Sequence, residues 1–243
     1  MAKSPTTTAP SITLNIDGRD VGATAGQTIL EVARENGIRI PALCYVEGLS
    51  IWGGCRLCVV EIVGSNKLLP ACATDCAQDM QVVTDSPRLR HYRRTVLELL
   101  FTEGNHICAV CVSNGHCELQ TMAQNLGITH IHVPYRYPHK QVDSSHDRFR
   151  MDHNRCILCT RCVRVCDEIE SAHTKDVKGR GIDARIINDL DEPWGDSETC
   201  TSCGKCVHVC PVGALVEKTT AAGEMSKQRT FLPYLTTMRE SRS

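Results

Sequence analysis

The sequence predicts an α+β fold of three successive domains followed by a short tail. Three observations predict this fold: apolar and polar residues alternate over residues 11–24, a helical pattern begins at Pro87, and one cysteine pattern occurs twice in the C-terminal third. The predicted boundaries are 1–86, 87–145 and 146–218, with the tail at 219–243. The 243 residues are enough to bury cores in two or three small domains.

The N-terminal pattern indicates a β-hairpin and a short helix. Residues 11–24 alternate on both sides of Asp17-Gly18, a dipeptide suited to the positive φ angles of a tight turn. Residues 27–36 place apolar side chains on one helical face, and Gly37 is available as the C-terminal cap. A further strand is expected over residues 80–84.

A longer helix is expected from Pro87 to about residue 102. Ser86 can cap its first turn, and proline is well tolerated at the first helical position. The stripe expected to face a core consists of Leu89, Tyr92, Val96, Leu99 and Leu100. The solvated face is expected to carry Arg90, Arg93 and Arg94. Residues 134–147 are polar and contain Pro138, which indicates a connection.

Composition narrows the class of protein. Acidic and basic side chains nearly balance, 28 against 27, so no global charge favours nucleic acid or an anionic membrane surface. Residues 1–11 lack the apolar region of an export signal, and no later stretch is apolar enough to cross a bilayer. We therefore expect a cytoplasmic protein, in which the 16 cysteines are reduced and metal ligation is their remaining large use.

The strongest motif is the repeat CILCTRCVRVC at 156–166 and CTSCGKCVHVC at 200–210. Both copies follow C-x2-C-x2-C-x3-C, the spacing of bacterial ferredoxins that hold two [4Fe–4S] clusters, in which the fourth cysteine ligates the other cluster. The predicted ligand sets are therefore crossed: Cys156, Cys159, Cys162 and Cys210 for one cluster, and Cys200, Cys203, Cys206 and Cys166 for the other. A zinc ribbon is the alternative for CxxC pairs, and two identical four-cysteine runs favour the clusters.

The first cysteine group lies directly after the hairpin and helix, in a β-grasp-like order. The spacing C-x10-C-x2-C-x13-C of Cys44, Cys55, Cys58 and Cys72 resembles the [2Fe–2S] domain of the large iron–sulfur subunit of respiratory complex I and of iron hydrogenases. Glycines at 53 and 54, next to Trp52, would let backbone N–H groups approach cluster sulfurs. Cys76 is an alternative fourth ligand, but the family spacing favours Cys72 and leaves Cys76 as a buried thiol.

The middle cysteine group is one ligand short of a complete set. Cys108, Cys111 and Cys117 follow C-x2-C-x5-C, and in the same family a histidine completes this pattern to hold a [4Fe–4S] cluster. The local candidates are His106 and His116, and His106 is preferred because the family histidine precedes the first cysteine. The family spacing is H-x3-C, whereas this sequence has H-x-C.

Together these resemblances imply an electron-transfer subunit with one [2Fe–2S] and three [4Fe–4S] clusters. The order of motifs, with no catalytic domain after them, resembles the small diaphorase subunits of bidirectional NAD-reducing [NiFe] hydrogenases. That resemblance implies a hetero-oligomer with a flavin- and NAD-binding diaphorase subunit and a hydrogenase small subunit. No dinucleotide-binding glycine motif, P-loop or nickel-type cysteine pairs occur in the sequence, so no active site of its own is expected.

Other assignments remain open at this point. A peripheral iron–sulfur subunit of an NAD-dependent formate dehydrogenase or of a complex I variant is the alternative within the same class. A free-standing redox enzyme and a structural zinc protein are alternatives from other classes. In the tail, an apolar group is expected to dock on a partner, and it consists of Phe231, Leu232, Tyr234 and Leu235.

Overall fold

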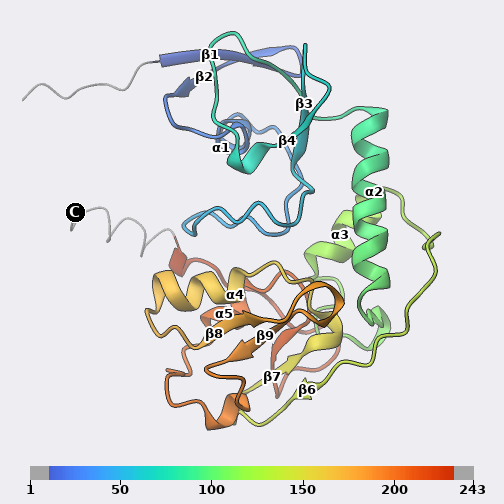
Figure 1. Ribbon diagram of the computed structural model, residues 1–243, viewed down its shortest axis with the longest axis vertical. Coiled ribbons are helices and arrows are strands. Elements are labelled where there is room, and N and C mark those ends of the chain that lie inside the picture. Colours follow the sequence, from blue (N-terminus) through green and yellow to red (C-terminus); the bar gives the residue numbers. More distant parts are fainter. Residues whose placement is uncertain (1–10, 233–243) are drawn as a thin grey trace, which may run out of the picture. The chain divides into compact units, whose positions relative to one another are not determined.

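The computed structural model describes residues 11–232 (Figure 1). Contacts between Cα atoms divide the chain into two compact units. Of the described residues, the first contains 11–42 together with 55–93, and the second contains 43–54 together with 94–232. Within residues 11–232, no helix is long and apolar enough to cross a membrane.

The first unit is a five-stranded sheet with one helix. The strands lie in the order β2-β1-β5-β3-β4, and only the β1–β5 pair is parallel. Their bounds are β1 Ser11–Ile16, β2 Arg19–Thr24, β3 Val59–Ile62, β4 Leu68–Pro70 and β5 Gln81–Val83, and the helix α1 is Ile29–Glu35. The core contains Leu14 and Ile16 from β1 and Ile29, Leu30 and Val32 from α1, each at most 1% exposed.

Local sequence signals set the turn and the helix ends in this unit. Asp17 and Gly18 both have positive φ, 51° and 82°, as a tight hairpin turn requires. Helix α1 begins with a capping box, in which the Thr28 side chain accepts from the Glu31 N–H and the Glu31 carboxylate accepts from the Thr28 N–H. Gly37, with φ of 70°, follows the end of the helix.

Helix α2, Pro87–Thr102, has the predicted bounds, and its predicted inner face is correct in part. Ser86 Oγ caps it by accepting from the Leu89 N–H at 3.2 Å. Leu89 and Leu97 are fully buried, whereas Leu99 is 46% exposed. Arg93 was expected in solvent but is 4% exposed, because its guanidinium donates to the carbonyls of Leu57 at 3.1 Å and Val59 at 2.8 Å. Backbone acceptors at the start of β3 therefore decide which side of the helix faces inward.

The second unit combines short helices with two small sheets. The sheet orders are β10-β7-β6 and β8-β9, all antiparallel. The strands are β6 Val142–Asp143, β7 Phe149–Asp152, β8 Lys175–Lys178, β9 Arg185–Asn188 and β10 Leu215–Glu217, and the helices are α3 Glu118–Asn125, α4 Arg161–Arg164 and α5 Lys205–Val209. A π-helical turn, Val165–Ile169, continues α4. The 3-10 turns are Cys108–Val110, His153–Arg155, Gly181–Asp183 and Trp194–Asp196, with Ala71–Ala73 in the first unit.

The described part of the tail packs on its own unit. The Met225 N–H donates to the carbonyl of Val112 at 3.0 Å, and Met225 is 4% exposed. Leu232 is 2% exposed and Phe231 is partly exposed, and docking of this apolar group on a partner stays a prediction. Tyr234 and Leu235 lie outside the described residues.

Candidate metal centres

The second unit brings the first predicted ligand set into one pocket. Cys156, Cys159, Cys162 and Cys210 all line one pocket. The rest of its wall is mostly apolar and consists of Met151, Ile157, Thr160, Ile186, Val212, Ala214 and Leu215. Cys210 therefore lies with the three cysteines of the other motif copy, which is the crossing that the sequence predicts.

The other ferredoxin-type set lines a second pocket. Cys200, Cys203, Cys206 and Cys166 all line this pocket. Cys166 reaches this pocket from the π-helical turn after α4, while Cys162, on α4 itself, lines the first one. The wall of the second pocket is more polar and includes Glu170, Lys175, Trp194 and Lys205.

Left-handed residues shape the loops of both motif copies. Leu158 and Thr160, on either side of Cys159, have φ of 50° and 56°, and Ser202 and Gly204 in the second copy have φ of 55° and 74°. Alternating left-handed residues turn successive backbone N–H groups to one side and form concavities that bind anions such as iron–sulfur clusters. One such group, the Leu158 N–H, donates to Cys156 Sγ at 3.4 Å. Three of these four residues are not glycine, and such strain is concentrated at functional sites.

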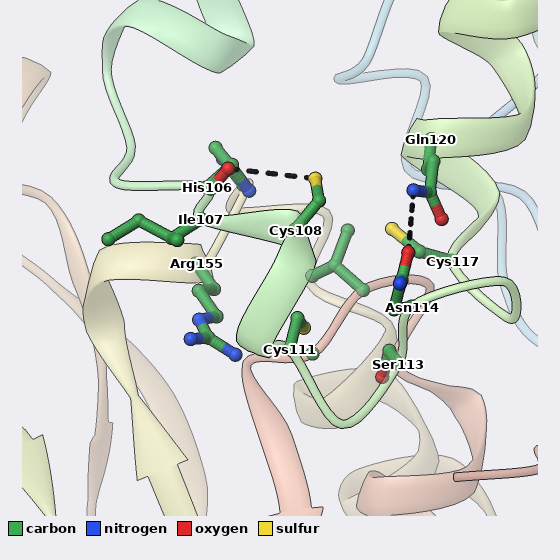
Figure 2. Close-up of a pocket in the computed structure, with 11 residues that line it drawn as sticks. His106, Ile107, Cys108, Cys111, Ser113, Asn114, Cys117, Gln120 and Arg155 are labelled. Carbon is green, nitrogen blue, oxygen red and sulfur yellow. Dashed lines mark hydrogen bonds between the residues drawn. The ribbon is translucent and has the colours of Figure 1, made fainter. Parts of the chain in front are cut away.

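The middle group lines a third pocket (Figure 2). His106 lies in its wall together with Cys108, Cys111 and Cys117, whereas His116 is exposed and does not line it. Within the described residues, His106 Nε2 is buried and has no hydrogen-bond partner. Burial lowers the pKa of His106 to about 4, and a hydrogen bond with the Leu100 backbone opposes this only in part. His106 is therefore a neutral imidazole, the form that ligates metals.

Two glycines leave room for these ligands. A Cβ on Gly104 would collide with His106 Nε2, so only glycine accommodates the ring at this place. A Cβ on Gly213 would lie 2.6 Å from Cys111 Sγ. The space near the histidine and the thiol is thus kept open by the backbone itself.

Burial disfavours the thiolate form of these cysteines unless a cation compensates the negative charge. It raises the pKa of Cys156 and of Cys206 to about 12, and that of Cys117 and of Cys159 to about 11. Metal ligation requires the thiolate, so binding iron would release protons and neutralise the buried charge. The donor set fits iron–sulfur clusters, which are held by Cys thiolates and sometimes by histidine. Among residues 11–232, no three Cys, His, Asp or Glu side chains are grouped to hold a single metal ion.

In the first unit, three of the predicted [2Fe–2S] ligands lie on neighbouring segments. Cys58 Sγ and Cys72 Sγ are 3.4 Å apart, and this hydrogen bond lowers the pKa of Cys58, while burial and the Cys55 thiol oppose it. Arg56, next to Cys55, is again left-handed with φ of 56°. The fourth, Cys44, belongs to segment 43–54, which is part of the second unit.

Cys76 has different surroundings. Its side chain is buried, and its N–H donates to the carbonyl of Gln27 at 2.9 Å. Burial raises its pKa to about 11, and the charged groups that add to the shift are Asp75, Glu31 and Glu35. No cysteine contributes to that shift, in contrast to the shift of Cys58.

Trp52 and its glycines show a local packing role. Trp52 is 53% exposed, and a Cβ on Gly54 would collide with its indole Nε1. Gly53 has φ of 65°, which favours glycine. The two glycines thus let the chain fold around the indole, and the predicted approach of their N–H groups to sulfur stays a prediction.

Two buried arginines were not singled out from the sequence. Arg161, 2% exposed, donates to both oxygens of Glu118 at 2.7 and 2.9 Å, to the carbonyl of Tyr45 at 3.0 Å and to that of Val209 at 3.3 Å. Arg164 donates to the carbonyls of Cys44 at 2.6 Å and Cys159 at 3.2 Å. Their only signal in the sequence is a position inside the cysteine motif.

Family models match this arrangement of motifs along the chain. A 2Fe-2S iron-sulfur cluster binding domain matches residues 9–87. The NADH-ubiquinone oxidoreductase-G iron-sulfur binding region matches residues 93–132. The ferredoxin-like domain of NADH-quinone oxidoreductase subunit 3 matches residues 147–216. The protein is therefore an iron–sulfur protein of mixed α/β structure, with one 2Fe-2S domain followed by 4Fe-4S binding regions.

Relatives along most of the chain place it in one family. The gamma subunit of the NAD-reducing hydrogenase HoxS of Cupriavidus necator is 32% identical, with 86% of this chain and 88% of the relative covered. A crystal structure of an NAD+-reducing [NiFe]-hydrogenase in the H2-reduced state contains a chain with a TM-score of 0.82 and 38% identity, with 87% of this chain and 89% of that chain covered. The chain belongs to the family of the HoxS gamma subunit, as the resemblance in the sequence indicated.

Other relatives are much longer than this chain. The HndD subunit of the NADP-reducing hydrogenase of Solidesulfovibrio fructosivorans is 41% identical over 85% of this chain, and the match spans 36% of the relative. The mitochondrial 78 kDa subunit of the NADH-ubiquinone oxidoreductase of Candida albicans is 32% identical over 85% of this chain, and the match spans 28% of the relative. The chain thus corresponds to about a third or a quarter of these relatives.

Proposed function

We propose that this chain is the iron–sulfur electron-transfer subunit of an NAD-reducing hydrogenase. It would relay electrons between a hydrogenase module and a flavin- and NAD-binding diaphorase subunit, in either direction. The observation that carries the proposal is that each of three pockets is lined by one complete predicted set of four ligands. The kinship with the HoxS gamma subunit supports the choice of complex.

The proposed cofactors are one [2Fe–2S] and three [4Fe–4S] clusters. Three sets of residues would hold the [4Fe–4S] clusters: His106 with Cys108, Cys111 and Cys117; Cys156, Cys159 and Cys162 with Cys210; and Cys200, Cys203 and Cys206 with Cys166. Cys44, Cys55, Cys58 and Cys72 would hold the [2Fe–2S] cluster, and the matching 2Fe-2S domain spans all four. When bound, such clusters accept and release single electrons at potentials that the protein tunes.

The residues of this chain would supply ligation, burial and charge, and no catalytic group. The apolar wall around Cys156 keeps water from the thiolates, and the backbone N–H of Leu158 is directed at sulfur. His106 would replace one thiolate by a neutral donor and so remove one negative charge from its cluster. We place the protein in the cytoplasm, where reduced cysteines are stable, with the diaphorase subunit and the hydrogenase small subunit as its partners.

Iron analysis with a histidine pair tests this proposal. Anaerobically purified chain should contain about 14 iron atoms, as one two-iron and three four-iron clusters require. His106→Ala should lose about four of them or convert one cluster to a three-iron form, because three thiolates leave one iron without a protein ligand. His116→Ala is the matched control, since His116 is exposed, and its iron content and paramagnetic resonance spectra should match the wild type.

Two outcomes would contradict the proposal. A wild-type chain with about four metal atoms, zinc among them, would reject the iron–sulfur assignment as a whole. Unchanged spectra in His106→Ala would show that another residue completes the third set.

A further inference from the structure

One buried lysine that lines a predicted cluster pocket forms no ion pair within residues 11–232, although its charge helps to lower the pKa of Asp143. Lys175 is 4% exposed and lines the pocket of Cys166, Cys200, Cys203 and Cys206. In the described part of the chain, its Nζ donates to the Asn188 amide oxygen at 2.8 Å and lies 3.7 Å from the centre of the Trp194 ring. Both partners are uncharged.

The fold holds this ammonium in place. Lys175 on β8 and Asn188 on β9 are directly paired in register, so their side chains lie on the same face of the two-stranded sheet. Asn188 is itself 4% exposed, and Trp194 is 1% exposed and stacks on Phe149 at 5.5 Å between ring centres. The face of an indole attracts a cation, and this attraction is strongest when water is excluded.

Comparison with the other lysine of this pocket shows what is unusual. Lys205 also lines it, but its Nζ forms an ion pair with the Glu170 carboxylate. A buried charge that forms no ion pair is costly, and proteins keep such charges where something compensates them. Four thiolates around an iron–sulfur cluster make a net negative group, which is the compensating charge this pocket would provide.

A second feature acts on the same cluster. Trp194 Nε1 donates to Cys200 Sγ at 3.2 Å. Hydrogen bonds to cluster sulfurs and nearby positive charge both stabilise the additional electron of the reduced state, and thus raise the reduction potential. The Trp194 indole therefore contacts the Lys175 ammonium with its ring face and donates a hydrogen bond to Cys200 from the N–H at its edge.

We propose that Lys175 and Trp194 together raise the reduction potential of the cluster held by Cys166, Cys200, Cys203 and Cys206. This inference rests on the ligand set of the proposed function and adds a role for two residues that ligate nothing. Both are positioning residues: the lysine supplies a fixed charge and the tryptophan a fixed donor. With its potential raised by these two residues, this cluster would be a preferred site for an electron within the chain.

A redox titration of the full-length chain, purified anaerobically and followed by electron paramagnetic resonance, tests the inference. Cys203→Ser identifies which [4Fe–4S] signal belongs to this cluster. Lys175→Met should lower the reduction equilibrium constant of that signal about tenfold, which is about 59 mV for a one-electron couple. Tenfold is the interaction of two unit charges about 12 Å apart at an effective dielectric constant of about 20.

Three further variants complete the design. Lys175→Arg keeps the charge and should restore most of the wild-type potential. Lys178→Met is the matched control, because Lys178 lies on the same strand but is 56% exposed and paired with Asp191 at 2.7 Å, so its loss should shift no cluster. Trp194→Phe keeps the packed ring but removes the donor to Cys200, and should lower the same potential in the same direction.

The outcomes separate this inference from the proposed function. If the wild-type chain shows no [4Fe–4S] signals, the proposed function fails. If those signals are present and unshifted in Lys175→Met, the inference alone is wrong. Should Lys175→Met lose the cluster, the Trp194→Phe titration decides, and an unchanged midpoint there overturns the inference.

Discussion

Replacing Arg161 by methionine should destabilise the protein more than any surface arginine does. The side chain is 2% exposed, and it holds the half-buried Glu118 carboxylate through two hydrogen bonds, at 2.7 and 2.9 Å. Removing one partner of a buried ion pair costs about 3–5 kcal/mol. Arg229 also contacts Glu118, at 2.6 Å, which favours the lower end of that range. The carbonyls of Tyr45 and Val209 lose a charged donor as well, so we expect about 3–5 kcal/mol in total.

The lower stability of Arg161→Met should make the clusters bleach at a lower temperature on heating. For a domain of 150–250 residues, about 1 kcal/mol corresponds to roughly 2–4 °C, so the midpoint of anaerobic thermal bleaching should fall by about 6–20 °C. Arg161 donates to neighbours of three predicted ligands, since Tyr45 follows Cys44, Glu118 follows Cys117 and Val209 precedes Cys210. Signals from several clusters should therefore broaden or disappear together.

Two variants make this result specific. Arg161→Lys keeps the charge but not the planar fork, so it should fall between the wild type and Arg161→Met. Arg90→Met is the surface control: its ion pair with Asp85 is exposed, and no measurable change is expected. A midpoint of Arg161→Met within about 2 °C of the wild type, less than about 1 kcal/mol, would refute the view that this guanidinium organises the cluster motifs.

Three other variants test the ligand sets and the Glu118 contact. Cys76→Ser should keep the [2Fe–2S] paramagnetic signal, whereas Cys72→Ser should abolish or strongly perturb it; loss of the signal in Cys76→Ser alone would reverse the assignment. Burial raises the pKa of Glu118, but the hydrogen bond and charge of Arg161, with Arg229, bring it below its ordinary value of 4.5. This carboxylate therefore stabilises the fold above pH 4.5 and ceases to do so as the pH falls through its lower folded-state pKa. Glu118→Gln should bleach faster than the wild type at pH 7, and the difference should shrink progressively as the pH falls below 4.5. His106→Cys should retain four irons but lower the potential of its cluster, because a thiolate adds negative charge; an unchanged midpoint in a redox titration would contradict ligation by residue 106.

The elements that depend on neighbours in sequence were predictable. The hairpin turn at Asp17-Gly18, the cap of α1 and the start of α2 at Pro87 each follow from a few adjacent residues whose φ angles or hydrogen bonds are set locally. The inner face of α2 was predicted only in part, because apolar periodicity does not register the carbonyls of Leu57 and Val59 that bind Arg93. The exposure of Leu99 follows from the same rotation of the helix.

The cysteine spacing by itself indicates an iron–sulfur protein, because two-residue gaps already constrain which sulfurs can face one cluster. It also indicated that Cys166 and Cys210, the fourth cysteines of the two motif copies, each ligate the cluster of the other copy. Spacing alone left the ligand of the third centre open between His106 and His116, and only the folded chain buries one imidazole beside the three thiols and exposes the other.

Local sequence patterns could not predict polar partners that lie far apart along the chain. Arg161 meets Tyr45 across 116 residues and Arg164 meets Cys44 across 120, and in the sequence both arginines look like ordinary charged residues between cysteines. A buried arginine differs from a solvated one, because a charged side chain removed from water must bind fixed polar partners in the protein. Whether Lys175 is a solvated lysine or the counter-charge of a cluster is likewise decided by the strand pairing that sets it beside Asn188 and by the indole that covers it.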